Sequence, residues 1–228
     1  PVLVDIPKDI QLAKCEYTPK GQAPCFEQKE VSDSEIDRAV QLINEAKRPY
    51  IYIGGGAAGA GLGKEIRLLA EKIDAFVGCS LMGLSTLPDS YDRFLGMQGM
   101  HGKYASTMAN READLVIGVG VRFSDRSTGN PKGIEKRARI IQLDTDLSEI
   151  DKNVKVDIGL VGNVVTTFKK LLERCEEKQH PEWNALINQF KAQGKDIFTE
   201  ESGANGALLT PKAMFDIINA IKSESTVI

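Results

Sequence analysis

Short apolar runs alternate with amphipathic helical stretches between residues 50 and 178, and this alternation constrains the fold more than any other feature. Runs such as Leu115-Val116-Ile117 are apolar at consecutive positions, which is typical of strands buried on both faces. The pattern predicts an α/β fold with three α/β/α layers and a roughly six-stranded, parallel, Rossmann-like sheet. Strands are predicted at 50–54, 75–80, 94–97, 114–119, 139–144 and 155–160, and helices at about 61–73, 103–111, 131–137, 146–151 and 163–178.

The residues before this region divide into an apolar start, a polar arm and one helix. Val2–Ile6 has the pattern of a strand, and residues 8–31 are polar and contain prolines, which indicates a connecting arm. Ser32 and Glu35 are spaced as a capping box and predict a helix that Pro49 ends. Because a strand without neighbours is not stable alone, we expect the chain to be an excised piece of a longer polypeptide.

The residues after this region predict two further helices. Residues 191–207 are polar and contain glycines, which indicates a linker. Thr210 as N-cap and Pro211 at the first helical position predict a short helix, and Ser225–Ile228 has the pattern of the first half of a strand. The helix before the linker has an apolar stripe of four residues: Trp183, Leu186, Ile187 and Phe190.

Composition excludes several classes of protein. The net charge is −3 and no stripe of Lys and Arg interleaves with aromatic residues, so nucleic acid is a poor candidate partner. No apolar run approaches the roughly 20 residues that span a bilayer, and no secretory signal is visible. The cysteines form no C-x-x-C pair, so we expect no metal site and reduced thiols in a cytoplasmic protein. They are Cys15, Cys25, Cys79 and Cys175.

A glycine-rich turn follows the first strand of the predicted sheet. Gly54-x-Gly56-x-x-Gly59 matches the dinucleotide-binding fingerprint, in which backbone N–H groups hold a phosphate. The NAD version also needs an acidic residue at the end of the next strand, but Asp74 stands before that strand. A P-loop is excluded as well, because Glu65 follows Gly63-Lys64. The alternative is a tight strand–helix turn in which glycine permits positive φ.

Two further strand ends carry residues suited to a flat, anionic ligand. In residues 95–102, three glycines frame Met100 and His101, and a backbone of this kind can press against a ring system while Met supplies a polarizable face. In residues 118–129, Arg122 and Arg126 suit a diphosphate, and Asp125 could orient one of them. The alternatives are a packed loop with a hydrogen-bonded His101, and a solvated loop with a local Asp–Arg pair.

A fourth strand end, in residues 140–146, supplies a carboxylate. Asp144 could bind the ribose that Asp74 cannot reach, although Asp144 or Asp146 could instead cap the next helix. Ligands of open α/β sheets bind at the carboxyl ends of the strands, so four such ends predict an extended nucleotide cofactor. We expect the strand ends of this sheet to serve the ligand in an order different from that in a dehydrogenase.

Together the runs GMQGMHG, ADLVIGVGVRFSDRSTG and ARIIQLDTDLSEIDKN closely resemble the central domain of the acetolactate synthase (acetohydroxyacid synthase) large catalytic subunit family, whose members depend on thiamine diphosphate. The resemblance spans the whole chain and implies a fold of the DHS-like NAD/FAD-binding type. It implies three parts. Residues 1–31 would be the end of a preceding pyrimidine-binding domain and a connecting arm, 32–178 the central FAD-binding α/β domain, and 179–228 a helix, a linker and the start of a following diphosphate-binding domain.

The resemblance also implies roles for particular residues. It places Met100, Asp125 and Arg126 near a substrate channel, and it places no catalytic or metal-binding residue in this chain. The sequence departs from many family members at Ser124, where they have Asp, and at Gly162-Asn163, where they have Gly-Asp, although Ser124 and Asn163 can also accept hydrogen bonds. The implied FAD contacts are Gly54, Gly55, Gly56, Ser80, Leu81, Met82, Gly99, Met100, His101, Gly120, Val121, Arg122, Arg126, Asp144, Thr145, Gly162, Asn163 and Val164.

As to function, the resemblance implies a parent enzyme that condenses pyruvate with a second 2-ketoacid, pyruvate or 2-ketobutyrate, in branched-chain amino-acid biosynthesis. FAD would be mainly structural in this domain, and thiamine diphosphate and Mg²⁺ would be bound by the flanking domains. This chain alone would then be inactive, and the parent would be a homo-oligomer with a possible regulatory subunit.

The sequence leaves alternatives to this function. The first is the central domain of another thiamine-dependent carboligase, for example one that acts on glyoxylate. The second is a structural spacer with an empty nucleotide site. A sirtuin-like NAD module is disfavoured, because such proteins need a zinc-binding cysteine set that the sequence lacks.

Overall fold

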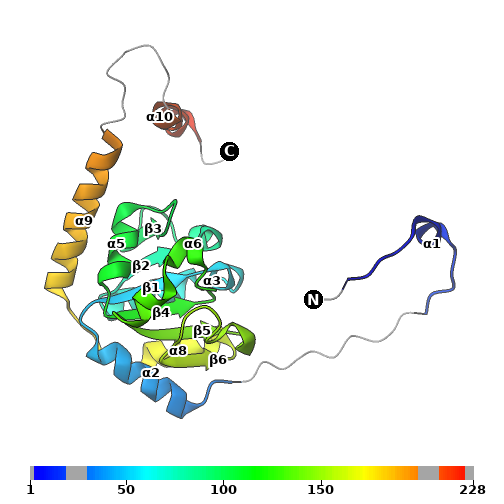
Figure 1. The fold of residues 1–228 in the computed structure, drawn as a ribbon, viewed down its shortest axis with the longest axis horizontal. Coiled ribbons are helices and arrows are strands. Elements are labelled where there is room, and N and C mark those ends of the chain that lie inside the picture. The colour runs from blue at the N-terminus through cyan, green and yellow to red at the C-terminus, as the bar shows by residue number, and fades with distance from the viewer. Residues whose placement is uncertain (1–2, 19–29, 200–210, 224–228) are drawn as a thin grey trace.

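The computed structural model describes residues 3–18, 30–199 and 211–223, and at its centre lies one parallel sheet (Figure 1). The strand order is β3-β2-β1-β4-β5-β6, with every pair parallel. The predicted α/β fold with six parallel strands is therefore confirmed. The strands are β1 (Pro49–Ile53), β2 (Phe76–Cys79), β3 (Phe94–Met97), β4 (Leu115–Val119), β5 (Arg139–Asp144) and β6 (Ile158–Val161).

This strand order is the one found in dinucleotide-binding folds. The spatial order of the strands therefore does not differ from that of a dehydrogenase. What differs is the position of the acidic residue, since β2 ends in Cys79 and Ser80 whereas β5 ends in Asp144.

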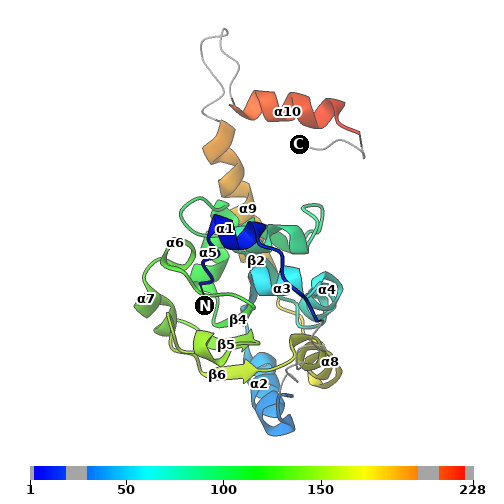
Figure 2. The same ribbon diagram turned by 90° about the vertical axis from the view of Figure 1, so that its right-hand side faces the viewer.

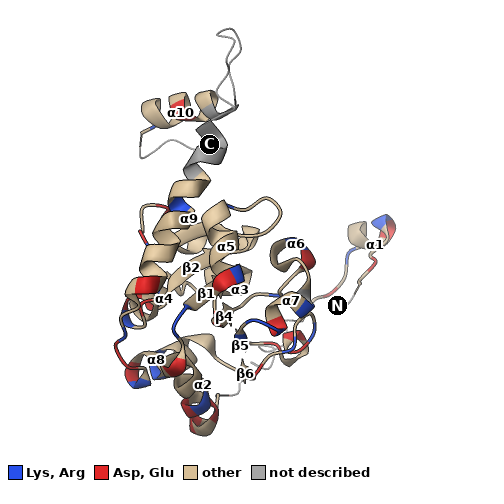
Figure 3. Cartoon of the chain, turned by 60° about the vertical axis from the view of Figure 1, so that its left-hand side comes forward, with Lys and Arg blue, Asp and Glu red and all other residues tan. Residues whose placement is uncertain are grey.

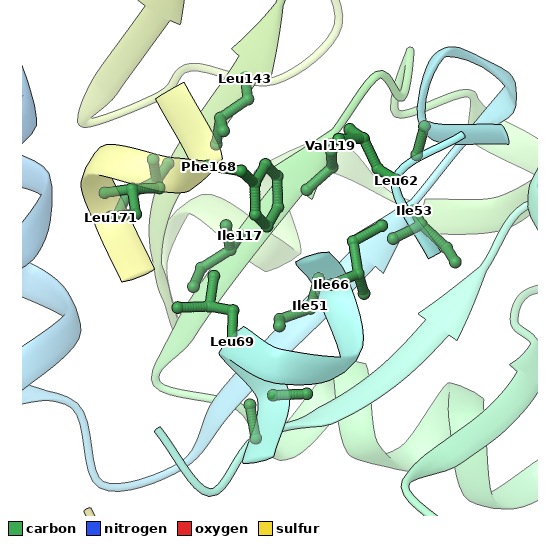
Figure 4. Close-up of a cluster of buried hydrophobic side chains, with 14 of the residues drawn as sticks. Ile51, Ile53, Leu62, Ile66, Leu69, Ile117, Val119, Leu143, Phe168 and Leu171 are labelled. Atoms are coloured by element: carbon green, nitrogen blue, oxygen red, sulfur yellow. The ribbon is translucent and has the colours of Figure 1, made fainter. Parts of the chain in front are cut away.

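Helices cover both faces of the sheet and so bury its strands on both sides (Figure 2). Side chains alternate along β1: Ile51 and Ile53 belong to one apolar cluster, and Tyr50 and Tyr52 belong to the other. Figure 4 shows the first cluster, in which Phe168 packs near Ile117. The helices on that face are α2 (Asp33–Glu45), α4 (Gly63–Lys72) and α8 (Val164–Arg174), and those on the other are α5 (Tyr104–Glu112), α7 (Pro131–Glu135) and α9 (Pro181–Thr199).

Helix α2 begins as the sequence predicts. The N–H of Glu35 donates to Ser32 Oγ at 3.4 Å, and the N–H of Ser32 donates to Glu35 Oε2 at 3.1 Å, which completes the capping box. On the outer surface of α2 and α8, acidic and basic residues are interspersed (Figure 3), and Arg174 pairs with Asp33 and Asp37. Charge on this face is therefore locally balanced.

Several short elements escaped prediction, because each is too short to show a periodic pattern. Figure 1 shows α1 and α10 apart from the sheet, and no side chain of α1 is buried. Pro211 opens α10 as predicted, whereas Val2, Cys25, Thr210 and residues 225–228 lie outside the described residues. The unpredicted elements are α1 (Lys8–Leu12), α3 (Gly55–Gly59), η1 (Leu81–Thr86) and α6 (Asp125–Thr128), whereas η2 (Leu147–Glu149) and α10 (Pro211–Ile221) lie where the sequence predicts helices.

Two predictions about the ends of the chain are wrong. Residues 3–6 form no strand and are exposed, since no neighbouring strand in the described chain pairs with them. Residues 191–199 continue α9 rather than forming a linker. They contain no proline and only one glycine, and a helix already anchored by Trp183 and Phe190 extends through such residues readily.

Two predicted elements in the sheet region are shorter than expected. The last strand starts at Ile158 rather than at 155, because the N–H of Lys155 donates to Glu135 and the N–H of Val156 donates to Asp151, each at 2.8 Å. These N–H groups are thereby withdrawn from the sheet. The helix predicted at 146–151 is only the three-residue 3₁₀ turn η2.

Asp74 stands before β2 and so is not placed to bind a ribose, and the structure shows that it is a buried structural hub. One carboxylate oxygen bonds Arg93 at 2.5 Å, and the other accepts from Asn184 Nδ2 at 2.7 Å and from the N–H of His180. Asp74 is 1% exposed and has a φ of 53°, a left-handed conformation that Asp tolerates better than most residues. It therefore ties the start of α9 to the sheet.

We predict that Asp74→Asn lowers the free energy of unfolding by about 3 kcal/mol, because an NH₂ group would face donors and Arg93 would lose its partner. Chemical denaturation measures the change. Asp89→Asn, which breaks the exposed Lys103–Asp89 pair, is the control and should leave the midpoint unchanged. Equal effects of the two substitutions would contradict the role of Asp74 as a hub.

Candidate functional site

A cleft of about 840 Å³ opens at the carboxyl ends of β1, β2 and β4. It lies where the strand order reverses between β1 and β4, the usual ligand position in such sheets. Its lining contains two arginines and no carboxylate. The lining residues are Tyr52, Gly54, Gly55, Gly56, Ser80, Leu81, Met82, Met97, Gln98, His101, Gly120, Val121, Arg122, Phe123, Ser124, Arg126 and Ser127.

The glycine turn after β1 packs directly against the end of β4. The N–H of Gly54 donates to Val119 O and that of Gly56 to Gly120 O, both at 3.0 Å. A Cβ on Gly54 would lie 2.2 Å from Gly120 O, and one on Gly56 would lie 2.7 Å from Gly120 Cα. Close backbone approach, rather than positive φ at the turn, therefore requires these glycines. The N–H groups of Gly54 and Gly56, which the sequence predicts as phosphate ligands, therefore donate to carbonyl groups of the protein instead.

Gly55, unlike Gly54 and Gly56, faces η1 rather than the end of β4. A Cβ on Gly55 would lie 3.1 Å from Met82 Cβ, so the glycine keeps space between α3 and η1. Leu81 and Met82 on η1 are 67% and 71% exposed although both are apolar. Together these residues form an apolar wall against which a flat ring could pack.

The loop after β3 and helix α6 are brought together at the rim of the cleft. The N–H of Met100 donates to Arg126 O at 3.0 Å. Gly99 has a φ of 97°, and a Cβ there would lie 2.4 Å from Arg126 O. His101 lines the cleft, whereas Gly99 and Met100 lie beside its lining. The two sequence motifs that predicted a ligand thus form one structural unit.

The two arginines of the cleft are held differently. Arg122 Nε lies 3.8 Å from Glu149 Oε1, and the side chain of Arg122 is 80% exposed. Arg126 forms no ion pair with any residue that the structure describes. Asp125 Oδ1 accepts from the main-chain N–H of Arg126 at 2.8 Å, and among the described residues Asp125 forms no ion pair with either arginine, so its orienting role stays a prediction. Both guanidinium groups can therefore meet an anionic ligand.

Phe123 separates Arg122 from Ser124 and has a φ of 47°, which is unusual for an aromatic residue. Its buried ring lies edge-on to Tyr52 with centroids 5.6 Å apart, and it occupies the space that a side chain at Gly118 would need. With Phe123 buried, its neighbours Arg122 and Ser124 are both exposed in the cleft. Backbone strain of this kind is often found at functional sites.

The residues predicted at the ends of β5 and β6 do not reach the cleft lining. Asp144 Oδ1 accepts from the N–H of Asp146 at 3.0 Å, and Asp146 caps η2 through the N–H of Ser148. Hydrogen bonding by the Ser148 side chain, and to a smaller extent by its main-chain N–H, lowers the pKa of Asp146. Asn163 caps α8 by accepting from Val165 N at 2.9 Å. The predicted residues outside the lining are Gly99, Met100, Asp125, Asp144, Thr145, Gly162, Asn163 and Val164.

Five residues of the lining have no role assigned from the sequence: Tyr52, Met97, Gln98, Phe123 and Ser127. Tyr52 is fully buried, and its hydroxyl has no hydrogen-bond partner within the described part of the chain. Burial raises the pKa of Tyr52 to about 12, although the nearby Ser127 side chain partly opposes this rise. The alternation in Pro49–Ile53 is the one signal that could have placed the tyrosine rings on a common face.

Comparisons with known proteins agree on one family. Residues 36–171 match the family described as "Thiamine pyrophosphate enzyme, central domain". The chain is 35% identical over 227 residues to the acetolactate synthase large subunit of Corynebacterium glutamicum, covering 96% of this chain and 36% of the relative. It is 35% identical to the acetolactate synthase isozyme 3 large subunit of Escherichia coli, covering 85% of this chain and 36% of that relative. It is 37% identical to the probable acetolactate synthase large subunit of Methanocaldococcus jannaschii, covering 98% of this chain and 39% of that relative.

The chain thus spans little more than a third of the length of these relatives. Among the described residues, no group of three His, Cys, Asp or Glu side chains could hold a metal ion. No described helix is both long enough and apolar enough to cross a membrane.

We predict that Gly54→Ala lowers the free energy of unfolding by about 2 kcal/mol or more, because the methyl group would collide with main-chain atoms of Gly120 and Val121. Gly59→Ala is the matched control, since nothing lies within 4 Å of a Cβ there. The control should be neutral or stabilising by up to about 1 kcal/mol. Thermal melting of both variants tests this, and a neutral Gly54→Ala would refute the requirement for close approach.

We also predict a pH dependence that Tyr52 contributes. Because its folded pKa of about 12 lies above the usual value of 10.0, its contribution to stability is complete below pH 10 and is lost as the pH rises toward 12. Between pH 9 and pH 11.5, Tyr52→Phe should therefore lose on the order of 2 kcal/mol less stability than the parent chain. Identical pH profiles would show that Tyr52 is not held in its neutral form by burial.

Proposed function

Since this chain belongs to the family of thiamine pyrophosphate enzyme central domains, we propose that it is the FAD-binding central domain of an acetolactate synthase large subunit. Relatives that carry this name cover nearly the whole chain at about 35% identity, which supports the proposal. Because the chain spans only part of those relatives, the activity of the whole enzyme is part of the proposal as well.

One observation supports a bound anionic cofactor above all others: the cleft is lined by Arg122 and Arg126 and by no carboxylate. Guanidinium groups bind phosphate oxygens in a bidentate manner, so this charge distribution fits a diphosphate. The apolar wall of Leu81 and Met82 beside Gly55 fits a flat ring. The residues present are therefore compatible with FAD.

The chain's own residues would bind and orient this cofactor. Arg122 and Arg126 would neutralise its charge, and the buried hydroxyl of Tyr52 could donate the hydrogen bond that it does not make within the protein. Ser124, in the cleft lining, could accept a hydrogen bond in place of the Asp of other family members. When bound, FAD supplies mainly structural stabilisation to this domain.

The predicted residues beyond the cleft lining could meet only the ends of an extended ligand. Asp144 keeps one carboxylate oxygen beyond the bond to Asp146, so it could still meet a ribose at the end of an extended ligand. Asn163 already uses its carbonyl oxygen as a helix cap. We retain Met100, Asp125 and Arg126 as the residues that would face a substrate channel, since all three lie at the exposed rim.

The proposed whole enzyme condenses pyruvate with a second 2-ketoacid, pyruvate or 2-ketobutyrate, in a cytoplasmic pathway of branched-chain amino-acid biosynthesis. Thiamine diphosphate, held with Mg²⁺ by domains outside this chain, would supply the electron sink for decarboxylation. This chain alone would condense nothing. Its exposed apolar residues near the two ends, such as Leu3, Val4 and Phe215, fit contacts with those flanking domains. A homo-oligomer with a regulatory subunit remains part of the proposal.

A structural spacer is the second candidate, because internal hydrogen bonds already involve the predicted contacts Asp144 and Asn163 and the N–H groups of Gly54 and Gly56. It predicts no cofactor affinity. The two candidates therefore differ in one measurable property.

Titration of the chain with FAD should quench flavin fluorescence, and Arg126→Ala should weaken binding about tenfold or more, because it removes a charged partner of the diphosphate. Arg67→Ala is the matched control, since Arg67 lies on α4 and pairs with Glu71. It should bind as the parent chain does. Unchanged fluorescence at saturating FAD would favour the spacer, and equal affinities of the two variants would exclude Arg126 as a ligand.

A further inference from the structure

Gln98 is a buried polar residue whose role the sequence did not reveal. It is 2% exposed, yet both ends of its side-chain amide are bonded. Tyr50 Oη donates to Gln98 Oε1 at 2.7 Å, and Gln98 Nε2 donates to Ser127 O at 3.2 Å. Through these two bonds the side chain joins the core of the sheet to helix α6.

The core end of this connection is rigidly placed. Tyr50 lies in the central strand β1 and is fully buried. Its hydroxyl also lies 3.0 Å from Ser106 Oγ, which donates to Gly96 O at 2.9 Å. A Cβ at Gly78 would lie 1.7 Å from Tyr50 Oη, so the glycine in β2 makes room for the hydroxyl. Gln98 Oε1 is therefore bonded to a fixed donor.

The other end holds an element with little stability of its own. Helix α6 is only four residues long, and a helix of that length is not stable without tertiary contacts. The loop after β3 bonds two successive carbonyl groups of α6: Met100 N–H donates to Arg126 O, and Gln98 Nε2 donates to Ser127 O. Both bonds flank the Cα of Ser127 and fix the main chain next to the Arg126 side chain.

We propose that Gln98 is a positioning residue that clamps α6 to the sheet and so holds the guanidinium group of Arg126 at the cleft. The clamp itself is independent of any ligand. Its effect on cofactor affinity rests on the proposed function, so the two parts need separate measurements.

Hydrogen exchange tests the clamp without a ligand. Gln98→Met keeps the size of the side chain and removes both bonds, so exchange of the Met100 amide should accelerate about tenfold. Gln142→Met is the matched control, because Gln142 is also a buried glutamine at 1% exposure but bonds Val121 and Glu149 instead. It should leave exchange at Met100 unchanged.

The amide of Ile117 in β4 reports global opening in the same experiment. Acceleration at Met100 without acceleration at Ile117 supports the clamp. An unchanged Met100 amide, or equal acceleration in both glutamine variants, overturns it. Tyr50→Phe removes the donor to Gln98 and the hydroxyl's contacts with Ser106, but it leaves the bond from Gln98 to Ser127 O in place. It should therefore accelerate Met100 exchange by less, about threefold.

A double-mutant cycle then tests the positioning of Arg126. Gln98→Met should weaken FAD binding about tenfold in the parent chain and less than about twofold in an Arg126→Ala background. Equal weakening in both backgrounds would show that Gln98 acts on the ligand in another way, and the positioning role would be wrong. If the parent chain itself does not bind FAD, the proposed function fails, and the hydrogen-exchange result alone decides the clamp.

Discussion

The structure depends on the close approach of two backbone segments at the centre of the sheet, the glycine turn after β1 and the end of β4. Gly54 and Gly56 each donate a hydrogen bond across this contact, and any side chain at either position would collide with Gly120 or Val121. Because β1 and β4 are the strands at which the sheet order reverses, the contact closes the floor of the cleft. Residues of η1 and of α6 then line the cleft around this contact.

The cleft combines an apolar wall with two arginines, and the acids near it are directed elsewhere. One carboxylate oxygen of Asp125 accepts from the main-chain N–H of Arg126, and Glu149, close to Arg122, also pairs with Lys152 at 2.7 Å. These carboxylates thus make bonds within the protein, whereas Arg126 forms no ion pair with the residues that the structure describes. This division explains why a chain with a net charge of −3 can present a positively charged cleft.

Patterns local in the chain could be predicted from the sequence, and contacts between segments could not. The six strands, the Ser32 capping box and the arginines after β4 follow from short-range spacing. The role of Gln98 depends on Tyr50 and Ser127, which lie far from it in the chain. Asp144 was expected as a ligand, but the competing local bond to the N–H of Asp146 cannot be weighed without coordinates. The length of α9 likewise depends on packing that its composition does not reveal.

The central claim is that the cleft between η1 and α6 is the cofactor site of this domain. Hydrogen exchange with and without FAD tests it most directly, because it locates the ligand along the chain. If FAD binds in this cleft, exchange should slow at residues 54–56, 80–82, 97–101 and 120–127 and change little on α2. Protection confined to other segments, or no protection at saturating FAD, would contradict it.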